Sequence, residues 1–351
     1  MSIDLEPLAK TTRLLFSVEL TPIQGERFQP TGFPSLGAAT YQTRDGLRLL
    51  VESAQSMANR METTCWDQKR NAPIAILEGI SHVTVRRKGE FFTDTMLEAH
   101  RLNSPYVMFG KMDRSTLFEQ LGSSLNAFEV GPTPSRNKVA EVLLKWDIGS
   151  LVHGAFLSAK KGKEKTLAGG RLRLPRAVSA FVEAAGVRVA ASGGVKNDHV
   201  NPSGDTKSGY GNVPFARDEF TAESILLHVN LDLAQIRGYG LGENAERLLM
   251  LLALHRVRNL IDGDMRFRTA CDFKIKTGGP VKAARPDGFI LPALRDLEAA
   301  LPAAISACQS QMAHTTVSYD DVLKKGKDGK GKKDDDTPEV DEDGDPEESG
   351  E

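Results

Sequence analysis

The sequence contains few of the residues that build disulfide frameworks, metal centres or membrane spans. It has only three cysteines in 351 residues, Cys65, Cys271 and Cys308, and they are odd in number and far apart. This arrangement forms no paired metal-binding motif and argues against a disulfide framework. No window approaches the roughly 18 consecutive apolar residues of a membrane-spanning helix, and Met1–Arg13 lacks the basic start and apolar core of a signal peptide. These absences predict a cytoplasmic protein with no membrane partner and no bound metal or cofactor.

Aromatic residues are also scarce, at 6% of the chain, whereas charged residues reach 26% and hydrophobic residues 40%. The last two values are ordinary for a globular protein, and the length allows one large or two ordinary domains. Many proteins that bind single-stranded nucleic acid stack the bases on aromatic rings. With so few rings, any nucleic-acid recognition by this chain should depend mainly on phosphate and sugar.

The formal net charge of −2 combines two segments of opposite sign. Residues 324–351 contain 6 lysines and 12 acidic residues, a net of −6, which leaves +4 on residues 1–323. The C-terminal segment has Val340 as its only large aliphatic residue, so it cannot bury enough apolar surface to offset its chain entropy. We therefore predict a folded body over 1–323 and a disordered, charged tail over 324–351.

Positive charge within the body is concentrated in two stretches. Residues 158–176 carry seven Lys and Arg against one acid, and residues 266–285 carry six against one. Two such stretches in a body of net +4 require compensating acidity elsewhere. A polarised surface of this kind is typical of proteins that bind a nucleic-acid backbone.

Hydrophobic periodicity predicts a mixture of strands and helices. Strands are predicted over Leu14–Leu20, Ile148–Leu157, Ile225–Leu233 and Ala270–Lys276, helices over Glu52–Thr63, Pro175–Ala185, Glu243–Leu260 and within 291–311, and a long loop or protruding hairpin over Ser192–Ala216. The elements follow no strict βαβ rhythm. The pattern therefore favours an α+β fold, with a sheet covered by helices on one face.

The helix predicted over Glu52–Thr63 has an unusual outer face. Its buried stripe consists of Ala54, Met57, Ala58 and Met61. The outer positions carry short polar side chains and one guanidinium: Ser53, Gln55, Ser56, Asn59 and Arg60. Such groups at a helix start suit phosphate oxygens, because the N-terminal amides point there as well. A solvated face would carry more Lys and Glu, so the composition favours a ligand.

The loop Gln24–Pro34 precedes this helix and combines turn residues with polar side chains. Arg27 and Gln29 could grip a phosphate, and Phe28 or Phe33 could stack a base. A purely structural turn with buried rings fits the same residues.

Enzymatic motifs are missing. The glycine-rich stretches miss the spacing of dinucleotide and phosphate loops, and the seven histidines form no metal-binding pattern. His153 lies in a predicted strand and could act as a general acid or base in RNA cleavage. A structural or backbone-contacting histidine is the simpler interpretation, since no partner acid or base is identifiable. We predict no catalytic residue.

Several blocks of sequence resemble one protein family. They are Arg27–Pro34, Leu36–Ala39, Leu50–Arg60, Leu151–Gly154, Arg176–Glu183 and Arg266–Asp272. They resemble the backbone subunit of type I-G (formerly I-U) CRISPR effector complexes, in the RAMP superfamily, and the likeness covers the body but not the tail. The most specific block is the Ser-Gln-Ser-x-x-Asn-Arg helix. It is similar to the Ser-Gln-x-x-Lys-Arg helix by which backbone subunits of related complexes hold guide RNA, with Asn59 where a Lys is common.

The resemblance implies an RRM-like (ferredoxin-like) palm with inserted finger and thumb segments at about 66–147 and 192–222. The thumb is expected either in Ser192–Ala216 or around Lys160–Gly170. Several copies would polymerise along one CRISPR guide RNA, beside other Cascade subunits, and present it for pairing with a target DNA strand in antiviral defence. Two alternatives stay open: an endoribonuclease of the same superfamily that uses His153, and a single-strand binder that forms no filament.

The residues expected to contact RNA fall into two groups. The groove is expected to consist of Arg27, Gln29, Ser53, Gln55, Ser56, Asn59 and Arg60, with Arg171, Arg173, Arg266 and Arg268 as flanking charges and His153 as a backbone-contacting histidine.

Overall fold

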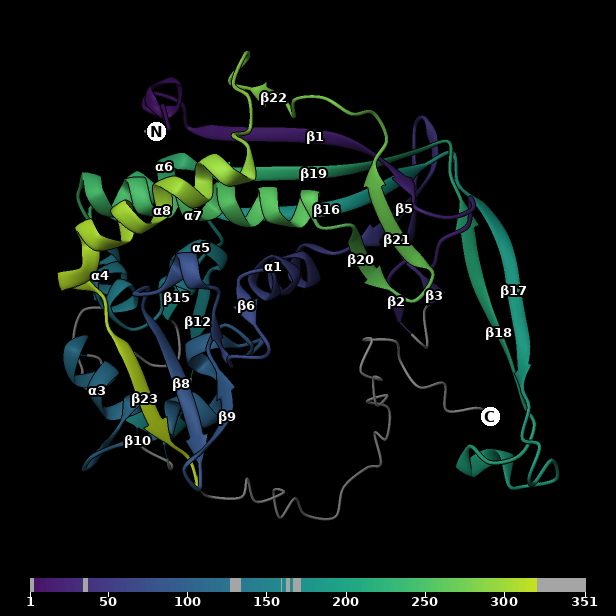
Figure 1. Cartoon of the computed structure of the whole chain (residues 1–351), viewed down its shortest axis with the longest axis horizontal. Helices are drawn as coiled ribbons and strands as arrows, with labels where there is room; N and C mark the ends of the chain where they lie inside the picture. Colours follow the sequence, from purple (N-terminus) through teal and green to yellow (C-terminus); the bar gives the residue numbers. More distant parts are fainter. Residues whose placement is uncertain are drawn as a thin grey trace.

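A large antiparallel sheet forms the centre of the folded protein in the computed structural model. The structure describes residues 3–33, 37–126, 134–158, 160–161, 165–166 and 172–320. Its strand order is β20-β21-β1-β19-β16-β5-β4, with β22 paired to β1 (Figure 1). The strands are β1 (Arg13–Pro22), β4 (Thr40–Thr43), β5 (Gly46–Glu52), β16 (Val178–Ala185), β19 (Ser224–Asp232), β20 (Met265–Arg268), β21 (Cys271–Ile275) and β22 (Ala283–Arg285).

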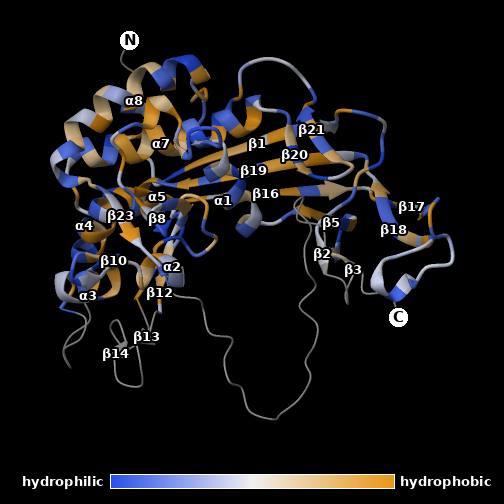
Figure 2. Cartoon of the chain, turned by 60° about the horizontal axis from the view of Figure 1, so that its bottom comes forward, coloured by the Kyte–Doolittle hydropathy of each residue, from blue (hydrophilic) through white to orange (hydrophobic). Residues whose placement is uncertain are grey.

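One face of this sheet forms the core. Phe16 of β1 pairs with Val229 of β19, which pairs with Ala180 of β16, and all three side chains are buried. Their neighbours along each strand point to the other face and are only partly covered, as the strand period of two requires. Figure 2 shows the hydrophobic residues along β1 and β19. The helices that pack here are α1 (Ala54–Thr63), α5 (Ile148–His153), α6 (Leu233–Arg237), α7 (Glu243–Asp262) and, on α7, α8 (Leu294–Cys308).

A second sheet, of order β11-β10-β23-β8-β9, is built mainly from residues between 82 and 116. It is completed by β23, which pairs in parallel with β8 although more than 200 residues separate the two strands in the chain. Its elements are β8 (His82–Arg87), β9 (Glu90–Asp94), β10 (Lys111–Met112), β11 (Ser115–Thr116) and β23 (His314–Ser318), with α2 (Pro105–Met108), α3 (Leu117–Ser124) and α4 (Arg136–Trp146) beside them. In Figure 1 this sheet lies below the central sheet, with α5 between them.

Further strands form two-stranded pairs outside the two sheets. The longest is the hairpin of β17 (Arg188–Lys196) and β18 (Val213–Thr221), which extends away from the remaining elements (Figure 1). The others are β2 (Gly32–Phe33) with β3 (Gly37–Ala38), β6 (Trp66–Asp67) with β7 (Ala72–Pro73), β12 (Ala155–Leu157) with β15 (Leu172–Leu174), and β13 (Lys160–Lys161) with β14 (Lys165–Thr166). The protruding hairpin predicted for Ser192–Ala216 is therefore confirmed.

The mixed helix and strand composition predicted from the sequence is confirmed, but two elements were assigned wrongly. The strand predicted over Ile148–Leu157 is the helix α5 followed by β12. Asp147 starts this helix, because its carboxylate accepts hydrogen bonds from the amides of Gly149 and Ser150, at 3.2 and 3.1 Å. The helix predicted over Pro175–Ala185 is the interior strand β16, in which buried Val and Ala residues alternate with half-buried residues. Pairing with β19 and β5 overrides its helix propensity.

The predicted tail, 324–351, and Arg171 lie outside the described residues. Within the described part of the chain, no helix combines the length and the apolar character that crossing a membrane would require. Cys65, Cys271 and Cys308 are all buried free thiols.

Candidate nucleic-acid interface

Helix α1 presents the polar face that the sequence predicts. Ser53 caps its start, because the Ser53 hydroxyl accepts a hydrogen bond from the Ser56 amide at 3.3 Å. Gln55 and Asn59 are exposed, and Ser56 is half-buried. The predicted inner stripe is confirmed: Met57, Ala58 and Met61 are buried, and Ala54 is half-buried. The helix start therefore offers backbone amides, a hydroxyl and amide side chains to the solvent on one side.

Arg268 does not belong to this exposed surface. Its side chain is 8% exposed and forms an ion pair with Glu52, the fully buried last residue of β5. The same guanidinium donates to the carbonyl oxygens of Gln29 at 3.0 Å and Val51 at 3.1 Å. The prediction that Arg268 supplies flanking charge to RNA is therefore corrected. It holds the Gln24–Pro34 loop against β5, because its charge and donors are satisfied inside the protein.

Arg60 is also engaged by the protein. Its Nε lies 3.2 Å from the Glu52 carboxylate, and its two terminal nitrogens donate to the carbonyl oxygens of Arg266 and Phe267. The guanidinium stands over the Phe267 ring, 5.3 Å from its centroid. With 27% of its side chain exposed, Arg60 can still approach a ligand. Its main contacts, however, pin α1 to β20.

Arg27 and Gln29 lie in the loop next to this contact between α1 and β20. Arg27 is 58% exposed, and its guanidinium lies 3.4 Å from Glu219 of β18. Gln29 is half-buried, and its backbone amide donates to the Ala270 carbonyl. Its side-chain oxygen is buried and has no hydrogen-bond partner within the described part of the chain. Between them, Phe28 is buried and bonds through its backbone to Phe220 in both directions. The loop therefore uses Phe28 as a structural anchor and presents Arg27 to the solvent.

Arg266 stands on the neighbouring strand β20 and is 61% exposed. Its Nε is 3.9 Å from Asp272, a distance at which an exposed ion pair contributes little. Because Arg60 bonds to the Arg266 carbonyl, the Arg266 side chain leaves from a point adjacent to α1. The structure thus brings Ser53, Gln55, Asn59 and Arg266 onto one region, and Arg27 lies two residues before Gln29, whose carbonyl Arg268 binds.

His153 lies in the interior, at the C-terminal end of α5, and is only 1% exposed. Neither ring nitrogen has a hydrogen-bond partner among the residues that the structure describes. Burial, together with the charges of Arg256 and Arg101, holds the pKa of His153 well below its ordinary value, so the ring is neutral. Both the RNA contact and the acid/base role considered for His153 are corrected, because this buried ring cannot reach RNA.

A second buried carboxylate fixes the other end of α1. Glu62 receives two hydrogen bonds from Arg101, at 2.7 and 2.5 Å, and lies 4.0 Å from Arg256 of α7. Burial raises the pKa of Glu62, while Arg101 opposes that shift. The helix is therefore held at its start by Glu52 and at its end by Glu62, each between two arginines. This arrangement positions α1 relative to both sheets.

Sequence reasoning missed two basic residues that directly follow α1. Lys69 and Arg70 are exposed in the turn between β6 and β7. The Asp67 carboxylate orders this turn by accepting from their amides, at 2.9 and 3.2 Å. The available signal was the pair of adjacent basic residues in a short turn after the polar helix. Two residues are too few to stand out beside the longer basic stretches.

Arg173 lies on β15, away from the start of α1. It is exposed and stacks on Phe156 of the paired strand β12, with its Cζ 4.4 Å from the ring centroid. Its predicted companion Arg171 is outside the described residues.

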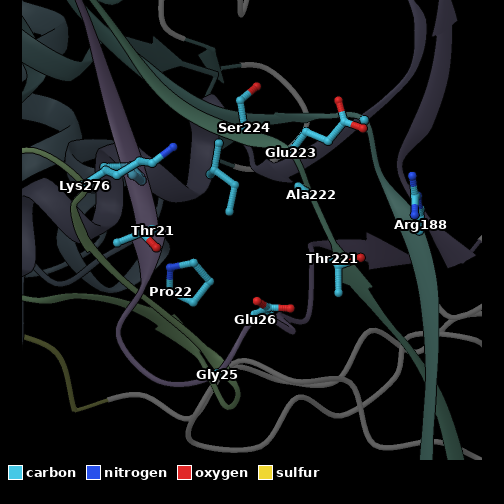
Figure 3. Close-up of a pocket in the computed structure, with 13 residues that line it drawn as sticks. Thr21, Pro22, Gly25, Glu26, Arg188, Thr221, Ala222, Glu223, Ser224 and Lys276 are labelled. Atoms are coloured by element: carbon cyan, nitrogen blue, oxygen red, sulfur yellow. The ribbon is translucent and has the colours of Figure 1, made fainter.

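A cleft of about 370 Å³ opens at the root of the β17–β18 hairpin (Figure 3). Arg188 and Lys276 lie on opposite sides of it, and Glu26 and Glu223 also line it (Figure 3). The two charges of each sign balance, so this cleft does not by itself select an anion. In the part of the chain that the structure describes, His, Cys, Asp and Glu form no group of three that could hold a metal ion.

Comparison with known proteins identifies the class of this chain. A family model described as CRISPR-associated protein GSU0053 (Cas_GSU0053) matches residues 14–189, half of the chain. The match spans β1, the Arg27 loop, α1 and β16. The protein is therefore CRISPR-associated. It belongs to the Cas_GSU0053 family, and the resemblance to CRISPR proteins seen in the sequence is confirmed at this level.

Solved structures of CRISPR proteins resemble the chain more distantly. One comes from a "CRISPR RNA-guided surveillance complex, pre-nicking", with 11% identity, a TM-score of 0.35, and coverage of 70% of this chain and 72% of that chain. Another is Csc2 of Thermofilum pendens, with 9% identity, a TM-score of 0.31, and coverage of 89% and 83%. No curated protein matches the sequence.

Proposed function

We propose that this protein is a non-catalytic subunit of a CRISPR effector complex and that it binds guide RNA through the phosphate backbone. The observation that carries the proposal is the family match over residues 14–189, since that segment contains α1 and the loop of Arg27. The start of α1, which the sequence singles out as a phosphate site, lies on the surface beside two exposed arginines, Arg27 and Arg266.

The topology supports an RRM-like palm. The elements β1, α1, β16, β19, α7 and β21 follow one another in the chain, and their strands lie in the order β21-β1-β19-β16. Two βαβ halves in this antiparallel order correspond to the ferredoxin-like arrangement. We assign the second sheet to the finger segment and the β17–β18 hairpin to the thumb. The hairpin is preferred because its two nine-residue strands extend away from the remaining elements (Figure 1).

The chemistry of this surface suits a ligand read through its backbone. Helix N-terminal amides, the Ser53 and Ser56 hydroxyls and the exposed guanidinium of Arg27 all bind phosphate oxygens without reading base edges. Such contacts leave the Watson–Crick edges of a guide free to pair with target DNA. A net charge of +4 on residues 1–323 fits a subunit that contacts a short RNA stretch. Several copies, beside other Cascade subunits, would then cover one guide.

RNA binding by the purified full chain tests this proposal. Fluorescence anisotropy with single-stranded RNAs of unrelated sequence should give similar affinities that fall steeply with salt. Gln55→Glu places a carboxylate at the start of α1 and should weaken binding about tenfold, because it repels phosphate. Gln311→Glu is the matched control, since Gln311 is equally exposed but follows α8. Strong sequence selectivity, or equal effects of the two substitutions, would refute the proposed interface.

The non-catalytic assignment has its own test. Incubation of the protein with CRISPR repeat RNA in the presence of a chelator should leave the RNA intact. Specific, metal-independent cleavage by the wild-type protein would overturn this part of the proposal and restore the endoribonuclease alternative. Its catalytic residue would then be sought among exposed groups, since His153 is buried.

A further inference from the structure

We propose that Phe156 and Arg173 form a stacking platform for one unpaired nucleobase of the bound RNA. The inference rests on the proposed function, because the base belongs to that RNA. It adds a second kind of contact at a place separate from the start of α1, and it assigns Arg173 a role beyond flanking charge.

The platform is a flat, solvent-facing pair of side chains. Phe156 and Arg173 are directly opposite in the antiparallel pair β12–β15, and the Arg173 Cζ lies 4.4 Å from the ring centroid. Phe156 is 42% exposed, although it lies in the middle of a paired strand. Leu157, Leu172 and Leu174, their neighbours along the two strands, are buried. The ribbon therefore packs one face against the protein and turns the stacked pair outward.

The ribbon is held in place, which a stacking platform requires. Beyond Phe156, the Ser158 amide donates to the Asn103 side-chain oxygen at 2.8 Å, and the Asn103 amide group donates to the Ser158 hydroxyl at 3.3 Å. These bonds tie β12 to the segment that carries Arg101, the partner of Glu62. A preorganised aromatic surface loses little side-chain freedom when a base stacks on it.

The sequence around the platform favours an anionic polymer over an apolar partner. The stretch 158–176 has seven basic residues and one acid; Phe156 precedes it by two residues and Arg173 lies within it. Arg176, three residues after Arg173, is within electrostatic reach of Glu62 at the end of α1. Helix α1 has ten residues and is thus about 15 Å long. An RNA strand that leaves the start of α1 along the helix would approach the platform at the other end.

A guanidinium stacked on an aromatic ring suits a nucleobase. Bases stack on Arg planes as well as on aromatic rings, and this contact tolerates any base, since every base has a π-face. The platform would hold one base at a defined place without reading its identity. The scarcity of aromatics fits a small number of stacking contacts, in place of the row of rings found in many single-strand binders.

Phe92 provides a comparison within the same chain. It is 36% exposed, and Arg87 stands 5.6 Å from its ring centroid. Its ring also packs edge-on against Tyr106, at 5.0 Å, and Tyr106 packs against Tyr319. Phe92 is thus part of an aromatic cluster of the second sheet, whereas among the described residues no second ring is recorded against Phe156. Phe92 serves as the matched control.

The test compares RNA binding of Phe156→Ala, Arg173→Lys and the control Phe92→Ala with the wild-type protein. Two probes are used, a single-stranded RNA and a strand of equal length with abasic positions throughout its centre. Phe156→Ala should raise the Kd for the normal strand about tenfold, with an unchanged salt slope. It should leave binding of the abasic strand unchanged. Arg173→Lys keeps the positive charge but removes the planar guanidinium, so it should also weaken binding of the normal strand and not of the abasic strand.

The outcomes separate the two proposals. If wild-type protein binds RNA but Phe156→Ala does not change the Kd, or weakens both strands equally, the platform is refuted and the proposed function stands. An equal loss in Phe92→Ala would also refute it, because the effect would then be a general consequence of removing an exposed ring. If wild-type protein binds no RNA, both proposals fail. Circular dichroism should show unchanged folding of Phe156→Ala, since the ring is exposed.

Discussion

Arg268 forms a buried ion pair with Glu52, and this pair joins the last residue of β20 to the residue that precedes the cap of α1. Arg60 reaches the same carboxylate from the helix. Arg60 and Arg268, which the sequence predicts as RNA-binding residues, therefore hold α1, β5 and β20 together. The exposed positive charge belongs to their neighbours Arg27 and Arg266, which are 58% and 61% exposed.

Removal of one partner of this pair should strongly destabilise the protein. Glu52→Gln leaves two guanidinium groups without their buried countercharge, which costs about 3–5 kcal/mol in comparable cases. Urea denaturation should show this loss in the free energy of unfolding. The double variant Glu52→Gln/Arg268→Met should lose clearly less than the sum of the single variants. Additive losses would show that the two residues do not interact.

Arg27 and Arg60 should respond to substitution in opposite ways. Arg27→Ala removes an exposed charge, so it should leave stability unchanged and lower the slope of log Kd against log salt by about one. Arg60→Ala breaks hydrogen bonds to β20 and should reduce the free energy of unfolding by about 2 kcal/mol. Parallel denaturation and anisotropy titrations measure both. A lower salt slope for a fully stable Arg60→Ala protein would restore Arg60 as a simple phosphate ligand.

The turn after α1 should contribute to RNA affinity. The double charge reversal Lys69→Glu/Arg70→Glu repels phosphate without disturbing packing, because both side chains are exposed and Asp67 orders the turn through their backbone amides. We expect a loss of at least tenfold in affinity at low salt that shrinks as salt rises. Arg295→Glu, at an 88% exposed position on α8, is the control for a general effect of negative charge. Equal losses in the two proteins would exclude a local contact.

Buried His255 should make stability depend on pH. Burial, and then the charge of Arg256, lowers the pKa of His255 from 6.5 to about 4. Between these values the unfolded chain binds a proton that the folded protein does not, so acidification favours unfolding. The shift corresponds to about 3 kcal/mol at roughly 1.4 kcal/mol per pKa unit.

A variant isolates the contribution of His255 to the pH dependence of the free energy of unfolding. The difference in the free energy of unfolding between wild type and His255→Gln should change by about 3 kcal/mol from pH 7 to pH 4, with the wild type losing more. Buried Glu62, whose raised pKa acts in the opposite direction, is common to both proteins and cancels. A difference that stays constant with pH would show that His255 is protonated equally in both states.

Deletion of residues 324–351 should leave RNA binding intact or slightly tighter at low salt. The segment carries a net charge of −6, so its removal takes away long-range repulsion between the chain and the RNA. That repulsion is screened at physiological salt, where the full chain and the truncated chain should bind equally. A marked loss of affinity on deletion would show that the lysines of the segment contact RNA.

The sequence alone predicted the elements with clear local patterns. The alternation in Ile225–Leu233 and the periodicity of Glu52–Thr63 correspond to β19 and α1, because each period by itself separates a buried face from an exposed one. The polar outer face of α1 was identified in the same way. Local patterns failed for Pro175–Ala185, where a proline near the first turn suggested a helix. Neighbours distant in the chain, β19 and β5, make that segment an interior strand.

By itself, the sequence determined the family, the mildly basic body and the polar helix, since these depend on residue identity and local spacing. Only the tertiary structure decided which charges face the solvent. Arg27 and Arg268 are the same residue type in neighbouring segments, yet one is exposed and the other is buried against Glu52. The difference arises because β5 and β20 meet across more than 200 residues of chain, and a carboxylate buried at that meeting point requires a cation. The same folding brought Phe156 opposite Arg173, a pairing that no local pattern reveals.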